Sequence, residues 1–196
     1  MKNAPQSLLA GYQRFRSGRY KEEADRYAAL EGGQAPETMV IACADSRVDP
    51  ATIFNAAPGE LFIVRNVANL VPPCMPADSG LHGTSAALQF AVESLHVKNI
   101  LVLGHAGCGG VAACLAAGAD QPVGNFIKPW VKLLDRARAD LGPTQDRQTA
   151  LEHAGVRQSI SNLATFPFVG KAISTGELKL FGAWFSIGLG ELVWLD

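Results

Sequence analysis

The sequence predicts an α/β fold: a central, mostly parallel β-sheet flanked by helices, with an N-terminal helical arm and C-terminal edge strands. Apolar runs at 38–43, 61–64 and 99–104 have the length of strands, and the last is continuously apolar in its middle, as in a parallel sheet buried on both faces. Helical patterns separate these runs, and such alternation indicates βαβ units. Two more strand-like segments, 178–187 and 191–195, lie near the end of the chain.

The helices follow from local signals. Residues 8–30 are predicted to be helical, because the apolar side chains of this stretch share one face. Asp49 and Pro50 are a typical N-cap and first residue of a short helix. Residues 84–97 repeat apolar side chains at helical spacing, and Gly109-Gly110 opens another helix. A later helix is indicated by the shared face of three residues, Val156, Ile160 and Leu163.

Length and composition indicate one globular domain over residues 1–196, in which residues 1–35 form the arm. Apolar residues make up 48% of the chain and charged residues 18%, with a net charge of -1. This balance indicates no nucleic-acid or membrane partner, and no apolar stretch is long enough for a membrane span. No secretory signal is recognisable, so we expect a cytoplasmic, reducing location, where cysteines serve metals or catalysis more often than disulfides.

Two clusters of metal-binding residue types follow apolar runs directly. Cys43 comes after the first predicted strand, and His105 and Cys108 come after the third. Ligand groups of α/β folds lie beyond the carboxyl ends of the strands, so we expect these three side chains at one edge of the sheet. Two thiols and one imidazole suit zinc, and three protein ligands leave one position open for chemistry. Taken singly, each residue is more simply a buried structural side chain.

Asp45 and Arg47 stand two positions apart, beside Cys43, and point the same way in an extended chain. A carboxylate paired with a guanidinium stays ionised near neutral pH. Asp45 can therefore hold a metal-bound hydroxide by a hydrogen bond. It can instead ligate the metal and close the site, or form an ordinary salt bridge.

Three segments carry a family resemblance. They are Cys43-Ala44-Asp45-Ser46-Arg47-Val48, Val64-Arg65-Asn66-Val67-Ala68-Asn69 and Gly104-His105-Ala106-Gly107-Cys108-Gly109-Gly110. In order and separation they resemble the signature segments of β-class carbonic anhydrases. Further similarity at 90–97, 166–169 and 182–185 extends the resemblance over nearly the whole chain.

The resemblance implies reversible hydration of carbon dioxide to bicarbonate and a proton, by a zinc-bound hydroxide. It assigns one Zn²⁺ per subunit to Cys43, His105 and Cys108, and it makes Asp45 and Arg47 the catalytic dyad. It also implies a homodimer or an assembly of dimers, in which we expect the arm to pack on a partner subunit.

The family has closed sites, in which the aspartate rests on zinc, and open, plant-like sites, in which water does. Gln34 matches the glutamine that open members use to contact the substrate from a neighbouring subunit, so we expect an open site. The resemblance places substrate contacts at Phe62, Val67, Phe90 and Gly109. The usual tyrosine of this pocket is here Phe90, which keeps an apolar wall but lacks the hydroxyl.

Other functions fit the same residues. A hydrolase of carbon disulfide or carbonyl sulfide would need the same metal and dyad. A non-catalytic, zinc-stabilised protein that binds carbon dioxide or bicarbonate would need Asp45 on the metal permanently. A thiol redox protein is disfavoured, because His105-x-x-Cys108 has a histidine where a redox motif has its second cysteine.

Overall fold

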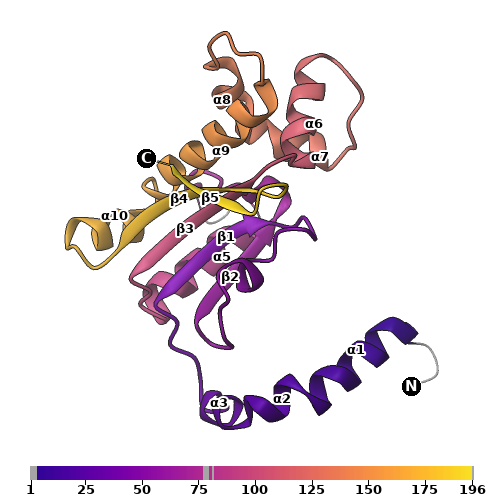
Figure 1. Cartoon of the computed structure of the whole chain (residues 1–196). Coiled ribbons are helices and arrows are strands. Elements are labelled where there is room, and N and C mark those ends of the chain that lie inside the picture. Colours follow the sequence, from indigo (N-terminus) through magenta and orange to yellow (C-terminus); the bar gives the residue numbers. More distant parts are fainter. Residues whose placement is uncertain (1–3, 77–79, 81, 196) are drawn as a thin grey trace. The chain divides into compact units, whose positions relative to one another are not determined.

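The computed structural model describes residues 4–76, 80 and 82–195. It divides into two compact units, Met1–Gln34 and Ala35–Asp196. The predicted fold class is confirmed, since the second unit is a five-stranded mixed sheet flanked by helices (Figure 1). In the described part of the chain, no helix combines the length and the apolar character that crossing a membrane requires.

The first unit consists of three helices, α1 (Gln6–Ser17), α2 (Arg19–Glu22) and α3 (Ala24–Leu30). The predicted helical stretch is thus interrupted, at Gly18 and at Glu23, where the backbone leaves helical geometry. Three aromatic rings hold the unit together, with centroids 5.1 to 6.0 Å apart: Phe15, Tyr20 and Tyr27. None of the residues of these helices is buried.

The sheet has the order β2-β1-β3-β4-β5. The strands are β1 (Thr38–Cys43), β2 (Leu61–Asn66), β3 (Asn99–His105), β4 (Lys179–Ser186) and β5 (Glu191–Leu195). The first four are parallel and β5 runs antiparallel along β4, so the predicted C-terminal edge is confirmed. The register pairs Cys43 with Asn66 and Leu103 with Ala42, which brings the ends of β1, β2 and β3 to one edge.

Short elements shape this edge. Asp49 caps α4 (Pro50–Ile53) by accepting a hydrogen bond from the Thr52 N–H, as predicted. The single turn η1 (Val67–Asn69) follows β2, and Ala68 in it adopts φ 65°, a left-handed conformation that is uncommon without glycine. The Ala44 N–H donates to the carbonyl of Asn66 at 2.8 Å and links the segment that follows β1 to the end of β2.

The helix predicted at 84–97 is shorter and not uniform. It comprises α5 (Gly83–Gln89) and a π-helical turn, η2 (Phe90–Ser94), in which the Leu95 N–H donates to the carbonyl of Phe90. Apolar spacing cannot separate one wide turn from an α-helix, because both place side chains three to five residues apart on the same face.

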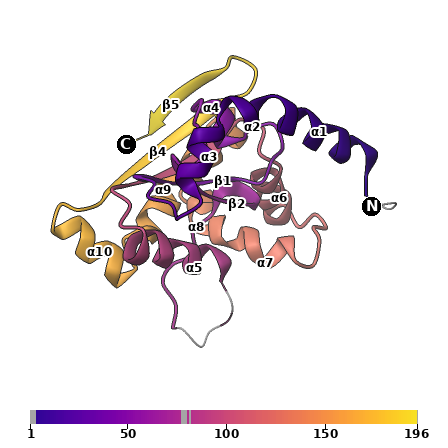
Figure 2. The same cartoon turned by 90° about the horizontal axis from the view of Figure 1, so that it is seen from below.

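The remaining helices follow β3. They are α6 (Gly109–Gly118), α7 (Ile127–Val131), η3 (Lys132–Leu134), α8 (Asp135–Ala139), α9 (Arg147–Leu163) and α10 (Pro167–Ser174). Helices α5, α9 and α10 cover one face of the sheet (Figure 2), where Ile41 and Val102 pack against Leu88, Val156 and Val169. The main core of the domain lies here.

The other face of the sheet is covered less completely. Val40, Leu101 and Ala183 lie on it, with α4 against one side. A hollow of about 390 Å³ opens between the strands and Phe54, and at its rim Phe181 is 40% and Trp194 is 60% exposed. A mostly parallel sheet is ordinarily buried on both faces, so the apolar side chains at this rim are more exposed than is usual for such a sheet.

Replacing Gly182 by alanine is expected to destabilise the fold by about 1–3 kcal/mol, because the core would be overpacked. A Cβ there would lie 2.7 Å from Ile160 Cδ1 and 2.9 Å from Val156 Cγ1, where α9 crosses β4. The urea midpoint measures the change. Gly83→Ala is the control, since its Cβ would meet open space; equal midpoints for the two variants would contradict the packing described.

Candidate metal centre and catalytic dyad

The structure brings the three predicted ligand residues together. Cys43 ends β1, His105 ends β3, and Cys108 directly precedes α6. Their ligand atoms all lie within 4.8 Å of one another, and the two sulfurs are 3.8 Å apart. All three side chains are buried, so the surrounding protein excludes water from most of their surface.

The imidazole of His105 is oriented for a ligand that the chain does not supply. Its Nδ1 donates to the carbonyl of Ala106 at 2.9 Å, which leaves the lone pair on Nε2. Among the described residues, Nε2 has no hydrogen-bond partner although it is buried. A buried nitrogen without a partner costs free energy, and a metal ion between Nε2 and the two sulfurs would remove that cost.

The sulfurs of Cys43 and Cys108 are joined by a hydrogen bond, so the charge of one affects the other. The hydrogen bond from Cys108 lowers the pKa of Cys43 against the effect of burial. The nearby imidazole of His105 and the N–H groups of Asp45 and Ala68 lower it further. The same hydrogen bond between the two sulfurs, together with burial, raises the pKa of Cys108. One negative charge is therefore favourable, and the second requires a cation. Two sulfurs and one nitrogen at these separations fit Zn²⁺.

Asp45 and Arg47 form a bidentate pair beside the ligands. Arg47 Nε lies 2.9 Å from Asp45 Oδ1, and its terminal nitrogen lies 2.7 Å from Oδ2. These hydrogen bonds hold the pKa of Asp45 well below its usual range, so the carboxylate stays charged. Arg47 also donates to the carbonyl of Gly107 at 3.2 Å, which ties the dyad to the loop between His105 and Cys108.

Asp45 lies next to the ligand group but is not part of it. Its Oδ2 is 4.0 Å from His105 Nε2, and both of its oxygens are engaged by Arg47. Asp45 is outside the group whose ligand atoms lie within 4.8 Å of one another, and two charge-assisted bonds from Arg47 hold its carboxylate in this position. The arrangement therefore supports three protein ligands and an open position, the alternative favoured from the sequence.

Two residues near the site, Glu152 and Gln148, were missed in the sequence, and Arg65 was noted only as part of the second family segment. Arg65 donates to the carbonyls of Cys43 (2.8 Å) and Asp45 (2.6 Å) and so fixes the segment that carries the dyad. Glu152 and Gln148, on α9, contact the backbone of Cys108. The sequence held one sign of Glu152: it lies four positions before Val156, on the apolar face of its helix. A charged residue on a face that packs into the core is unusual and usually has a specific partner.

Two of the predicted substrate residues lie beside the ligands. Val67 begins η1, and a Cβ added to Gly110 would come within 2.6 Å of its Cγ1, so the turn packs closely on the start of α6. The Trp130 indole donates to the carbonyl of Val67 at 2.8 Å and fixes this turn. At Gly109 a Cβ would meet open space, which leaves the backbone there accessible.

Two other predicted substrate residues, Phe62 and Phe90, are not brought to these ligands. Phe62 pairs with Met39, at the end of the sheet opposite Cys43 and Asn66. Four residues of strand, about 13 Å at ~3.3 Å per residue, separate it from that edge. Phe90 packs on Phe62 with ring centroids 5.9 Å apart. Gln34 is exposed and belongs to the N-terminal unit.

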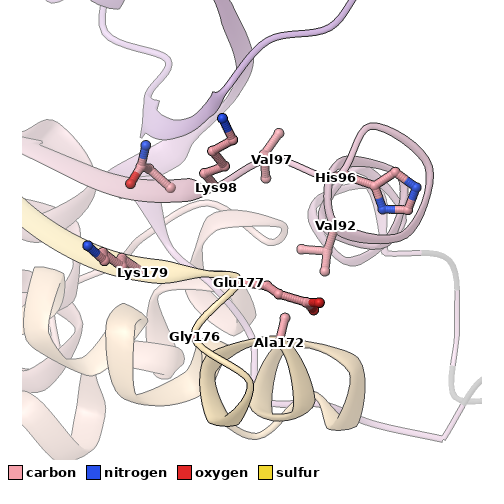
Figure 3. A pocket seen from close by; sticks show the side chains of 9 residues that line it. Val92, His96, Val97, Lys98, Ala172, Gly176, Glu177 and Lys179 are labelled. Atoms are coloured by element: carbon pink, nitrogen blue, oxygen red, sulfur yellow. The ribbon is translucent and has the colours of Figure 1, made fainter.

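A pocket of about 740 Å³ lies at the opposite edge of the sheet, where β3 and β4 begin (Figure 3). Glu177 extends between Val92 and Ala172, and Lys98 is already paired with Glu37. None of the ligand or dyad residues lines it. The pocket is therefore separate from the chemistry described above.

The fold and the site define an α/β protein with a buried Cys-His-Cys group and an adjacent Asp-Arg pair. A family model described as carbonic anhydrase matches residues 38–192, and the chain belongs to the β-class carbonic anhydrase family. Beta carbonic anhydrase 5, chloroplastic, of Arabidopsis thaliana is 36% identical over 178 residues, 88% of this chain.

Solved structures agree. The β-carbonic anhydrase CcaA superposes with a TM-score of 0.89 at 30% identity, over 97% of this chain and 87% of that one. A tetrameric β-carbonic anhydrase of Sordaria macrospora gives a TM-score of 0.85 at 30% identity, over 97% and 96%. The chain spans only 58% of the length of the Arabidopsis relative.

Proposed function

We propose that this chain catalyses the reversible hydration of carbon dioxide to bicarbonate and a proton, with one Zn²⁺ per subunit held by Cys43, His105 and Cys108. The observation that carries the proposal is the buried, unpartnered Nε2 of His105, which faces two thiols while the charged Asp45 stands 4.0 Å away. Membership of the carbonic anhydrase family supports the choice of reaction.

Zn²⁺ in this group would act as a Lewis acid and lower the pKa of a water molecule to near neutrality. The chain's own residues then act on that water. Asp45, kept ionised by Arg47, accepts a hydrogen bond from the attacking hydroxyl and directs the oxygen lone pair toward the substrate carbon. Val67 supplies an apolar wall for a small, uncharged substrate, and Arg65 keeps the segment of Asp45 in place.

Stopped-flow hydration of carbon dioxide by the zinc-loaded chain tests the proposal. We expect a rate far above the uncatalysed one, with weaker turnover of carbon disulfide and carbonyl sulfide on the same preparation. Turnover of a sulfur analogue without carbon dioxide hydration would point to the hydrolase. Zinc binding with neither activity would point to the binding protein.

We also propose that the active unit is a homodimer or an assembly of dimers. Supporting observations are the incompletely covered sheet face with Phe181 and Trp194 at its rim, and the absence of buried residues in α1–α3. In such an assembly the arm packs on a partner, and Gln34, Phe62 and Phe90 serve the partner's site. Sedimentation at micromolar concentration tests this, and a monomer with full activity would contradict it.

We propose a cytoplasmic or otherwise reducing location, because Cys43 and Cys108 must remain thiols to hold zinc. The four cysteines are all free in the structure. Cell fractionation tests this point, and recovery of the chain from an oxidising compartment would contradict it.

A further inference from the structure

A buried carboxylate lies directly behind one of the ligands. Glu152, on α9, is only 2% exposed. Its Oε1 accepts hydrogen bonds from the Cys108 N–H at 2.9 Å and from Gln148 at 2.7 Å, and its Oε2 accepts one from the Trp184 indole at 2.9 Å. The ion pairs found among the described residues do not include Glu152.

The peptide groups of Cys108 are held on both sides. Its N–H donates to Glu152, and its carbonyl accepts from Gln148 Nε2 at 3.0 Å. Gln148 in turn donates to Glu152, four residues along the same helix, so the two side chains form one clamp. The clamp fixes the backbone from which the Cys108 sulfur projects.

These hydrogen bonds keep the Cys108 sulfur close to the Cys43 sulfur. The two sulfurs stand 3.8 Å apart, and two thiolates at that distance repel each other. Burying a carboxylate without a cation is costly, and an apolar side chain would serve packing alone more cheaply. Hydrogen bonds behind a metal ligand orient it, and their loss typically weakens metal binding by about 10–100-fold.

We propose that Glu152, with Gln148, is a positioning residue that presets the Cys108 sulfur for metal binding. The inference rests on the proposed zinc site and deepens it. Glu152 reaches the metal through Cys108 and does not touch the substrate. The Trp184 indole donates to the oxygen of this carboxylate that does not contact Cys108.

The test is the zinc dissociation constant, measured by competition with a chromophoric chelator. Glu152→Met removes the acceptor at similar volume and is expected to weaken zinc binding about 10–100-fold. Glu152→Gln keeps one carbonyl acceptor and should recover part of that loss. Trp184→Phe, the matched control, removes the third bond to the same carboxylate. It should leave zinc affinity within about threefold while lowering the urea midpoint of the metal-free chain.

Unfolding of each metal-free variant in urea shows which variants are folded. If Glu152→Met does not fold, Gln148→Met replaces it, with an expected loss of zinc affinity of about 10-fold. Equal zinc affinity in a folded Glu152→Met chain and the wild type would overturn the inference. So would equal losses in Gln148→Met and Trp184→Phe. Failure of the wild type itself to bind zinc would instead overturn the proposed function.

Discussion

A Cys108→Ser variant is expected to lose zinc and to lower kcat/KM for carbon dioxide hydration by about 10³-fold or more. Serine is a poor ligand for zinc at neutral pH, and it would leave one sulfur and one nitrogen in a group that has three donors. A catalytic metal supplies several kcal/mol of transition-state stabilisation, and about 4 kcal/mol corresponds to 10³-fold in rate. Metal content by mass spectrometry and stopped-flow hydration measure both effects.

Cys74→Ser is the matched control, because the same atom is exchanged in an exposed thiol outside the ligand group. It should keep one zinc per chain and full activity. A Cys108→Ser chain with a full equivalent of zinc and unchanged hydration would remove Cys108 from the proposed ligand set.

The second large effect is expected at the dyad. Asp45→Asn keeps the size of the side chain but removes its charge and one of the two acceptors for Arg47. We expect kcat to fall about 10²-fold with zinc retained, because loss of an orienting acceptor costs typically ~10²–10⁴-fold. Stopped-flow kinetics and zinc content separate the two outcomes. Asp49→Asn is the control, since asparagine also caps helices and α4 should persist.

The pH dependence of this loss follows from the sign of the pKa shift. Arg47 lowers the pKa of Asp45, so the carboxylate becomes protonated only at a pH well below the range in which aspartate ordinarily titrates. It is therefore fully charged at neutral pH. The ratio of wild-type to Asp45→Asn activity should therefore be the same at pH 6.5 and pH 8.5. A ratio that falls toward one as the pH approaches 6.5 would mean that Asp45 becomes protonated there. That result would contradict a carboxylate held ionised by two hydrogen bonds from Arg47.

The strands were predictable to within a few residues because they are short apolar runs between turn signals. The ligand group was predictable for a related reason, since Cys43 and His105 end parallel strands and so meet at one edge. The register of the strands was not predictable from the sequence. The distance of Phe62 from that edge, which depends on the register, was therefore not predictable either. A segment motif does not say toward which end of a sheet a residue lies, or toward which subunit.

Polar contacts between distant parts of the chain also escaped the sequence. Arg65 reaches the segment after β1 across the sheet edge, and Glu152 reaches Cys108 over 44 positions. Both depend on how α9 and the strands pack, which no local pattern encodes. The π-helical turn η2 shows the same limit on a smaller scale, because its apolar spacing looks α-helical.

Titration of the metal-free chain with zinc, followed by stopped-flow carbon dioxide hydration, tests the central claim most directly. Hydration should rise in proportion to added zinc and level off at one ion per chain. Hydration that is already complete without zinc, or that stays at the uncatalysed rate after one equivalent has bound, would contradict the account.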